Sequence, residues 1–359
     1  MTTSSTDHQE ANTVTAKRGS RFLSGGQSVF ASHEQKDIAR ALDDGLDQVE
    51  AGLVEQLRFA DDVADSVGRY LFDAGGKRVR PLLTLLTSQW GEGITDEVII
   101  GAQVIELTHL ATLYHDDVMD EAHQRRGVTA AQKVWSNSIA ILAGDLLFAR
   151  AGSLGVELGQ AAMKRQAEIF ERLVLGQMRE TVGPKPGDEP IDHYLSVLSD
   201  KTGSLIALAA EFGVTLSGAP GTLVGPVTKF GEDIGIAFQL VDDVIDLADP
   251  SQGTGKLPGT DVRRGVTTLP MLLLEQKADD DSASAALLAT LRKGATGDIA
   301  EDDFQKAIVE LRHHDVTEAT MDIARDIADR AVSHLDDAPP GVVTDALVRF
   351  AGQVVERSQ

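Results

Sequence analysis

Apolar side chains recur every three or four residues through most of this chain, and this spacing constrains its fold more than any other feature. Aromatic residues make up only 4% of the sequence, runs of strand-forming residues are scarce, and good helix formers dominate. We therefore expect an all-α protein. The segment from 41 to 59 illustrates the period with Leu42, Leu46, Val49, Leu53, Val54 and Leu57.

Glycine and proline place the expected helix boundaries. Gly75 and Gly76 end one helix, and Pro81 lies near the start of the next. A long apolar helix then leads into HDDVMD at 115–120, a loop HQRRGVTA follows, and PKPGDEP is a turn by composition. No linker is long enough to separate domains. We expect one all-helical domain from 34 to 359, preceded by a flexible polar tail over residues 1–33.

Charge and composition exclude several classes of function. The 359 residues carry a net charge of -23, which argues against binding nucleic acid or an anionic membrane surface. Cysteine is absent, so thiolate catalysis, disulfides and zinc-thiolate sites are excluded. We expect no transmembrane segment, because no apolar run approaches the ~20 residues that a spanning helix needs. The N-terminus has no apolar core like that of a signal peptide, which favours a cytoplasmic location.

Two clusters with D-D-x-x-D spacing lie in otherwise apolar helical stretches, HDDVMD at 115–120 and VDDVIDL at 241–247. Asp116 and Asp120 are four residues apart, as are Asp242 and Asp246, so each pair shares one helix face. A single cluster is equally well explained as the solvated edge of an amphipathic helix. Two copies require a counter-charge that neither motif supplies, and Mg²⁺, which binds carboxylates together with substrate phosphates, fits best.

Short basic clusters beside glycines interrupt the acidic background. Glycine lets backbone N–H groups approach an anion, and arginine grips phosphate oxygens in a fork. Alone, GGKRVRP is more often an exposed helix start, and GTGK lacks the spacing of a P-loop. Together with the two carboxylate clusters, the basic clusters predict a pocket for more than one diphosphate. Their main residues are Lys77, Arg80, Arg125, Arg126, Lys201 and Lys256.

The ordered series of motifs resembles the trans-isoprenyl diphosphate synthases of the long-chain type. It comprises GGKRVRP, ELTHLATLYHDDVMDEAHQRRG, AILAGDLLFARA, KTGSL, FQLVDDVIDL, GTGK and GTDVRRGVTTLP, from about residue 40 to 275. The resemblance implies a single large helical bundle around a central cavity. It also implies about two or three Mg²⁺ ions per active site and a homodimer, with the helix around 140–149 as an interface candidate.

The resemblance also assigns roles to individual residues. Both aspartate-rich motifs would bind Mg²⁺ and the allylic diphosphate, with Asp116 and Asp242 as the most direct ligands. A lone histidine on an apolar helix is usually a core residue, but His109 lies seven residues before Asp116, two turns back on the same helix. The metal-binding and catalytic aspartates are Asp116, Asp117, Asp120, Asp242, Asp243 and Asp246. The isopentenyl diphosphate site is carried onto Lys77, Arg80, His109 and Arg126. The allylic contacts fall on Arg125, Lys201, Thr202, Gln239 and Lys256, of which the two lysines also count as catalytic.

The expected chemistry follows from charge neutralisation. Cations stabilise a departing diphosphate, so the allylic C–O bond ionises, the double bond of isopentenyl diphosphate attacks the cation, and a proton is lost. Product length depends on the helix before Asp116, where bulky residues four, five or eight positions back would block a growing tail. Thr112, Ala111 and Thr108 occupy these positions and are small, although Tyr114 could intrude. We expect a long-chain product, used for the side chain of menaquinone and made from a geranyl, farnesyl or geranylgeranyl primer.

Other functions remain open at this point. A short-chain farnesyl or geranylgeranyl diphosphate synthase shares all the motifs. A noncatalytic subunit of a heteromeric synthase would be expected to have lost aspartates, which this chain retains. A terpene cyclase or a head-to-head condensing enzyme has no use for Lys77, Arg80 and His109. A plain helical scaffold leaves both aspartate clusters unexplained.

Overall fold

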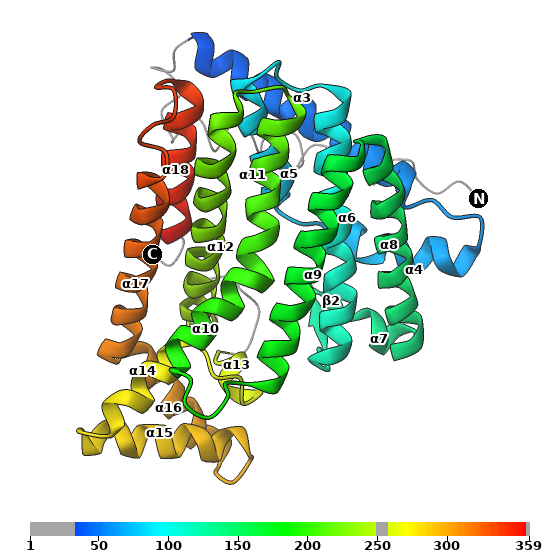
Figure 1. The fold of residues 1–359 in the computed structure, drawn as a ribbon. Helices are drawn as coiled ribbons and strands as arrows, with labels where there is room; N and C mark the ends of the chain where they lie inside the picture. Colours follow the sequence, from blue (N-terminus) through cyan, green and yellow to red (C-terminus); the bar gives the residue numbers. More distant parts are fainter. Residues whose placement is uncertain (1–32, 249–257, 357–359) are drawn as a thin grey trace, which may run out of the picture. The chain divides into compact units, whose positions relative to one another are not determined.

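The computed structural model of the chain describes residues 33–248 and 258–356, and helices dominate it (Figure 1). The all-α prediction is confirmed. The helical segments are α3 (His33–Gln56), α4 (Asp62–Asp73), α5 (Val79–Thr87), η2 (Ser88–Trp90), α6 (Asp96–Met119), α7 (Ala131–Val134), α8 (Asn137–Glu157), α9 (Gln160–Val182), α10 (Pro190–Leu198), η3 (Ser199–Gly203), α11 (Ser204–Leu216), η4 (Gly221–Leu223), α12 (Val224–Asp246), α13 (Thr260–Arg263), α14 (Leu269–Ala278), α15 (Ser282–Ala295), α16 (Glu301–His313), α17 (Asp315–Ser333) and α18 (Val342–Glu356).

The described residues form two compact units, which we treat separately. The first unit comprises 33–169, 205–228 and 337–349, and the second comprises 170–204, 229–336 and 350–356. The single domain from 34 to 359 and its central cavity therefore stay predictions. The predicted flexible tail over 1–33 falls outside the described residues except for His33, which begins α3.

Helix boundaries follow local sequence signals. Asp61 caps α4 by accepting the backbone N–H groups of Val63 and Ala64, and Thr95 caps α6, as expected for side chains that satisfy the free amides of a first turn. The break predicted at Gly75 and Gly76 is present between α4 and α5. These caps fix where α6, which carries the first aspartate cluster, begins.

The segment HQRRGVTA is more ordered than the loop that we expected. Strands β1 (Gln124–Arg125) and β2 (Val128–Thr129) pair in an antiparallel hairpin. The connecting residues Arg126 and Gly127 both have positive φ, 53° and 79°, which is the geometry that suits a two-residue hairpin turn. Each strand has only two residues, so no alternating pattern could have revealed it.

The first unit is organised around α6, which is buried on most of its faces. Helix α8 runs beside it (Figure 1), and a Cβ at Gly144 would lie only 3.1 Å from the Ala111 carbonyl oxygen. Among the described residues, α8 is the one helix long and apolar enough to cross a membrane by length and composition. A helix that packs against a neighbour inside a protein has the same composition, so this feature alone is weak evidence for a membrane span.

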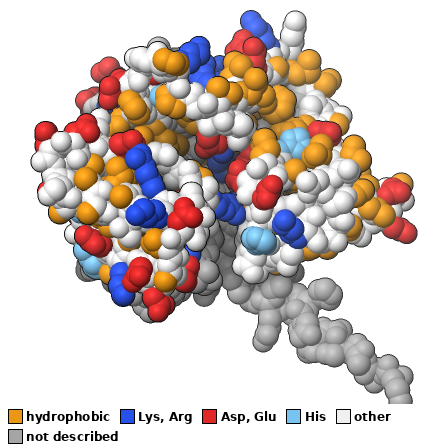
Figure 2. Space-filling view, turned by 90° about the horizontal axis from the view of Figure 1, so that it is seen from below, with side chains coloured by type: hydrophobic (Ala, Val, Ile, Leu, Met, Phe, Trp, Pro, Cys, Tyr) orange, Lys and Arg blue, Asp and Glu red, His pale blue; other side chains and the backbone are white. Residues whose placement is uncertain are grey.

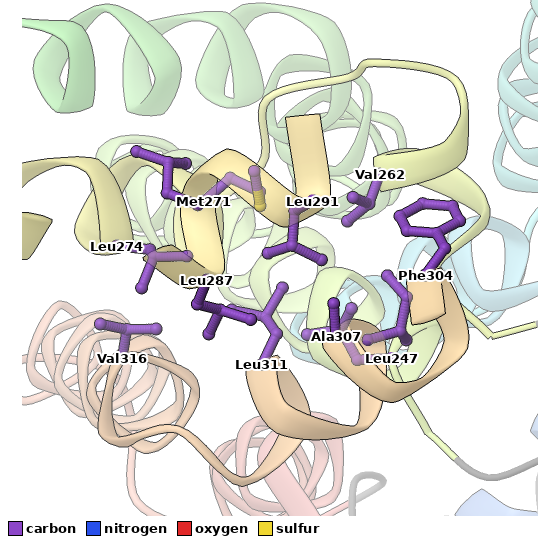
Figure 3. Packing of buried hydrophobic residues seen from close by; sticks show 12 residues of the cluster. Leu247, Val262, Met271, Leu274, Leu287, Leu291, Phe304, Ala307, Leu311 and Val316 are labelled. Atoms are coloured by element: carbon purple, nitrogen blue, oxygen red, sulfur yellow. The ribbon is translucent and has the colours of Figure 1, made fainter. Parts of the chain in front are cut away.

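The second unit has its own hydrophobic core, formed mainly by α13 to α16 (Figure 3). Val262, Leu291 and Phe304 come from three of these helices and are almost fully buried. Leu247, directly after the second aspartate cluster, joins the same core. On the molecular surface, acidic and basic side chains are intermixed with scattered hydrophobic ones (Figure 2).

Candidate active site

Each aspartate cluster lies at the carboxyl end of a long helix. Helix α6 ends at Met119 with Asp120 as its C-cap, and α12 ends at Asp246. Neither helix has a basic residue in its last turn. The carboxyl end of a helix carries partial negative charge, so additional carboxylates there are unfavourable unless cations offset them. Both clusters therefore occupy positions that favour a bound cation.

The middle aspartate of the first cluster is held inside the first unit. Asp117 is fully buried, and its Oδ1 accepts from Nε and Nη2 of Arg125 at 2.7 and 2.6 Å. Its carbonyl oxygen accepts from Nε2 of Gln132 at 2.6 Å. Because Arg125 lies on β1, the hairpin places this guanidinium against the aspartate cluster.

The middle aspartate of the second cluster has a different partner. Asp243 is buried, and the Tyr194 hydroxyl on α10 donates to its Oδ2 at 2.5 Å. The Gln239 amide lies 3.5 Å from the other oxygen. Burial raises the pKa of the Asp243 carboxyl well above its ordinary value, and the pKa of Tyr194 is also raised by burial. No basic side chain is recorded at hydrogen-bond distance from Asp243 within the described residues.

The outer aspartates are more accessible than the middle ones. Asp120 is exposed, and Asp116, Asp242 and Asp246 are partly exposed. One oxygen of Asp246 accepts the backbone N–H of Asp261 at 3.0 Å, which ties the start of α13 to the second cluster. Their oxygen donors suit Mg²⁺, and the outer aspartates are the residues that would hold it.

Within 33–248 and 258–356, no three or more His, Asp or Glu side chains are close enough to form a metal centre by themselves.

An arginine cluster in the first unit surrounds a buried acid. We define it as Arg78, Arg80 and Arg126 with Glu106. Arg78 lies 3.0 Å from Glu106 and 2.6 Å from Glu50, and Arg126 lies 3.9 Å from Glu106. The Arg126 Nη1 also donates to the Leu71 carbonyl at 2.7 Å. Positive charges outnumber the acid at the centre of the cluster, so the region suits an anion.

The environments of Arg80 and His109 favour a bound anion. Burial lowers the pKa of Arg80 to about 10, partly opposed by Glu106, and its Nε is buried without a hydrogen-bond partner. Burial, followed by the charges of Arg80 and Arg126, lowers the pKa of His109 well below its usual value. The imidazole is therefore neutral near pH 7. Lys77 is exposed at the edge of the same segment.

The predicted allylic contacts in the second unit lie on a distorted helical turn. Lys201 and Thr202 belong to η3, a π-helical turn between α10 and α11, and π turns occur often at functional sites. The Lys201 ammonium lies 2.6 Å from Oε2 of Glu180 on α9. Gln239 is on α12, one turn before Asp243. Lys256 lies outside the described residues.

The predicted chain-length residues line the middle of α6 and are buried. Ala111 has no exposed surface, and the hydroxyls of Thr108 and Thr112 bond to carbonyl oxygens of their own helix. The alternative that Tyr114 intrudes is not supported. Its hydroxyl donates to the Val67 carbonyl and accepts from the Leu71 N–H at 3.2 Å, so the ring points toward α4.

Sequence reasoning missed several partners of the site. In the sequence, Glu106 looks like an ordinary polar residue in an apolar helix. Tyr194 precedes the KTGSL motif but belongs to no recognisable motif. Arg78 differs from its basic neighbours only through its contacts. No spacing rule connects Tyr194 with Asp243, because 49 residues separate them. A buried glutamate one turn before His109 was the one signal that could have been used.

The oxygen-rich clusters at two helix ends suit a divalent metal, and the separate cationic region suits a diphosphate. The chain belongs to the polyprenyl synthetase family, whose model matches residues 61–310. It is 42% identical to a nonaprenyl diphosphate synthase of Mycobacterium tuberculosis over 90% of this chain and 94% of that protein.

Two solved structures place the chain in the same family. A geranylgeranyl pyrophosphate synthase of Corynebacterium glutamicum, complexed with calcium and isoprenyl diphosphate, is 40% identical with a TM-score of 0.77, covering 92% of this chain and 99% of that one. A decaprenyl diphosphate synthase of Rhodobacter capsulatus is 32% identical with a TM-score of 0.79, covering 90% and 99%. These relatives differ in the product named for each, so similarity alone does not choose a product length.

Proposed function

We propose that this chain is a Mg²⁺-dependent prenyltransferase that condenses an allylic diphosphate, head to tail, with successive isopentenyl diphosphates to give a long-chain all-trans polyprenyl diphosphate. The observation that carries the proposal is the pair of D-D-x-x-D clusters at helix ends, each with its middle aspartate buried and its outer aspartates more accessible. Carboxylates arranged in this way need cations. The family match supplies the reaction class.

The residues of the chain divide into two groups by their expected roles. The outer aspartates of both clusters hold Mg²⁺, which neutralises the leaving diphosphate when bound. Arg125, Lys201 and Lys256 contact the allylic diphosphate, with Thr202 and Gln239 beside them. Lys77, Arg80, His109 and Arg126 hold isopentenyl diphosphate. A neutral His109 suits this role because it donates a hydrogen bond without requiring a further counter-charge.

A long-chain product is favoured by the small buried residues of α6. Thr108, Ala111 and Thr112 leave no bulky side chain eight, five and four positions before Asp116, and both threonine hydroxyls are already bonded to backbone carbonyls. In this proposal, the side of α6 formed by these three residues presents methyl groups to the growing prenyl chain. Farnesyl or geranylgeranyl diphosphate as the final product is the alternative, and the relative from Corynebacterium glutamicum is an example of the latter class by its name.

A homodimer is proposed from the outer face of α8. Leu142 and Val156 on this helix are 60% and 63% exposed, and apolar side chains exposed together on a protein surface often mark an interaction site. A second copy of the chain would cover these side chains. We further propose a cytoplasmic enzyme with one catalytic domain over 34–359 whose product serves as a menaquinone side chain, in keeping with the acidic, cysteine-free sequence.

The decisive experiment is a product assay. Purified protein is incubated with Mg²⁺, radiolabelled isopentenyl diphosphate and one primer at a time: geranyl, farnesyl or geranylgeranyl diphosphate. The dephosphorylated products are then sized. Long polyprenols would support both the prenyltransferase activity and the proposal that the small residues of α6 leave room for the growing prenyl tail. Products that stop at the length of farnesol or geranylgeraniol would support the prenyltransferase reaction but contradict the long-chain product. No incorporation with any primer indicates a subunit that requires a partner chain.

A further inference from the structure

The η3 turn that carries Lys201 is anchored by a network of charged side chains in the second unit. Arg172 on α9 is at its centre. Its Nε donates to Oδ1 of Asp200 at 2.5 Å, and its Nη1 and Nη2 donate to Glu232 at 2.9 and 2.6 Å. Nη2 also donates to the Ser199 hydroxyl at 2.7 Å. Ser199 and Asp200 are the first two residues of η3, so one guanidinium grips the turn immediately before Lys201.

Further contacts hold the same turn from both sides. The Ser199 hydroxyl donates to Glu232 on α12 at 2.5 Å, and Arg179 on α9 pairs with the second oxygen of Asp200. A Cβ at Gly176 would lie 3.0 Å from the Lys201 backbone nitrogen, and one at Gly235 would lie 2.5 Å from Gly203 Cα. Larger residues at either glycine would displace η3. Helices α9 and α12 therefore fix this turn by close backbone approach as well as by charge.

The network has the properties of a positioning device. Hydrogen bonding to Glu232 raises the pKa of Arg172 above its ordinary value despite the opposing effect of burial. Planar guanidinium groups that bind carboxylates in two directions fix geometry better than an ammonium can. A π-helical turn is also costlier than a regular helix, and persists where its surroundings hold it.

We infer that Arg172, through Asp200, Ser199 and Glu232, is a positioning residue that holds the η3 turn so that Lys201 and Thr202 reach the allylic diphosphate. This inference rests on the proposed function, because it takes the role of Lys201 from it. In the proposed role the network acts on the substrate through Lys201 and Thr202, and Arg172 itself is assigned no substrate contact. Its loss moves Lys201 without removing the ammonium, and displacements of about 1 Å cost up to about a hundredfold in rate.

Arg165 offers a matched control on the same helix. It lies on α9, pairs through Nε with Glu211 at 2.9 Å, and its side chain is 32% exposed, as is that of Arg172. The Arg165 pair does not contact η3 in any recorded bond of the described residues. Arg165→Met therefore measures what the loss of a similar ion pair does to stability alone.

The test compares steady-state kinetics of the full-length wild type, Arg172→Met, Arg172→Lys and Arg165→Met, with each substrate varied in turn. We expect Arg172→Met to lower kcat/KM for the allylic diphosphate by about tenfold to a hundredfold, while KM for isopentenyl diphosphate changes less than about twofold. Arg172→Lys should recover part of the loss, because it restores the charge but not the fork. Arg165→Met should match the wild type within about twofold.

The outcomes separate the two proposals. An inactive wild type contradicts the proposed function, and the positioning role of Arg172 then loses its basis. An active wild type with equal kinetics in Arg172→Met and Arg165→Met overturns the positioning role. A rise in KM for isopentenyl diphosphate as large as that for the allylic diphosphate would also overturn it, because it indicates general damage. If Arg172→Met fails to fold, Glu232→Gln, which keeps the shape and removes one charge, must show the same selective loss for the allylic substrate.

Discussion

The two aspartate clusters share one sequence pattern, but their middle residues meet different neighbours. In the first unit Asp117 pairs with the Arg125 guanidinium, whereas in the second unit Asp243 accepts a hydrogen bond from the neutral Tyr194 hydroxyl. One buried carboxylate thus has a charged partner, and the other has none among residues 33–248 and 258–356. Identical spacing in sequence therefore does not imply identical electrostatics, because the partners come from segments that the motif does not include.

The basic residues of the two units also differ in how they are paired with acids. In the first unit Arg78, Arg80 and Arg126 outnumber the central acid Glu106. In the second unit Arg172 is paired on every side with Asp200 and Glu232. The first unit thus has surplus positive charge for an anion, and the second uses its arginine to hold a turn. We expect the first unit to bind a diphosphate directly and the second to depend more on metal.

Removal of an outer aspartate should have the largest effect. Asp116→Ala and Asp242→Ala should each lower kcat by about a hundredfold or more, with little change in thermal unfolding because both side chains are partly exposed. Turnover with saturating Mg²⁺ and both substrates is the measurement. Asp302→Ala, an exposed acid in the first turn of α16, is the control. Near-normal turnover in both variants would refute the metal role of the clusters.

Product length tests the first unit alone. Ala111→Phe should shorten the polyprenyl product, because a ring at this buried position of α6 would reduce the space for the growing prenyl chain. The profile of chain lengths is the measurement. Thr112→Val, which is nearly isosteric, should leave that profile unchanged. Overpacking costs about 1–3 kcal/mol of unfolding free energy, so the variant's melting is measured in parallel. An unchanged profile in a folded Ala111→Phe would mean that this residue does not line that space.

Most helices could be predicted from the sequence because their signals are local. The apolar period of 41–59, the Gly75 and Gly76 break and the caps act within a few residues, and α3, α4 and α5 agree with them. The aspartate clusters were recognisable for the same reason, since four-residue spacing on a helix is a local property. The hairpin at Arg126 and Gly127 depended on two backbone angles, and two-residue strands leave no periodic trace.

Partners distant in sequence could not be predicted. Tyr194 meets Asp243 and Arg172 meets Glu232 across 49 and 60 residues, and only packing brings them together. The π turn at 199–203 has no periodic signature in the sequence and was not predicted. These residues decide the charge and orientation of the site. Sequence therefore indicates which chemistry is present, and the structure indicates how the groups are held.

Asparagine substitution should separate the two middle aspartates. Asp117→Asn leaves Arg125 without its charged partner and should lower the free energy of unfolding by about 2 kcal/mol, allowing for the partial exposure of the arginine. Asp243→Asn keeps an oxygen that accepts from Tyr194 and should cost less than about 1 kcal/mol. Denaturant unfolding without metal measures both. Equal losses would remove the contrast between the clusters.

The smallest effect concerns the pH dependence of stability. The folded pKa of His109 lies well below its usual value, whereas an unfolded histidine titrates near pH 6.5. Below that pH the unfolded chain takes up a proton that the folded chain does not, so this residue destabilises the protein as pH falls. At pH 5.5 the contribution is at most about 1.4 kcal/mol, and it vanishes above pH 7.

His109→Gln should therefore lose less stability than the wild type between pH 7.5 and pH 5.5, by up to about 1.4 kcal/mol. His123→Gln is the control, because His123 is exposed and its imidazole is hydrated in both states. Denaturant unfolding at the two pH values gives the difference directly. If His109→Gln follows the wild type, the imidazole is protonated in the folded chain at pH 5.5. Burial and the arginine charges would then oppose protonation of His109 less than the structure implies, and the excess of positive charge in the first unit would be smaller than we infer.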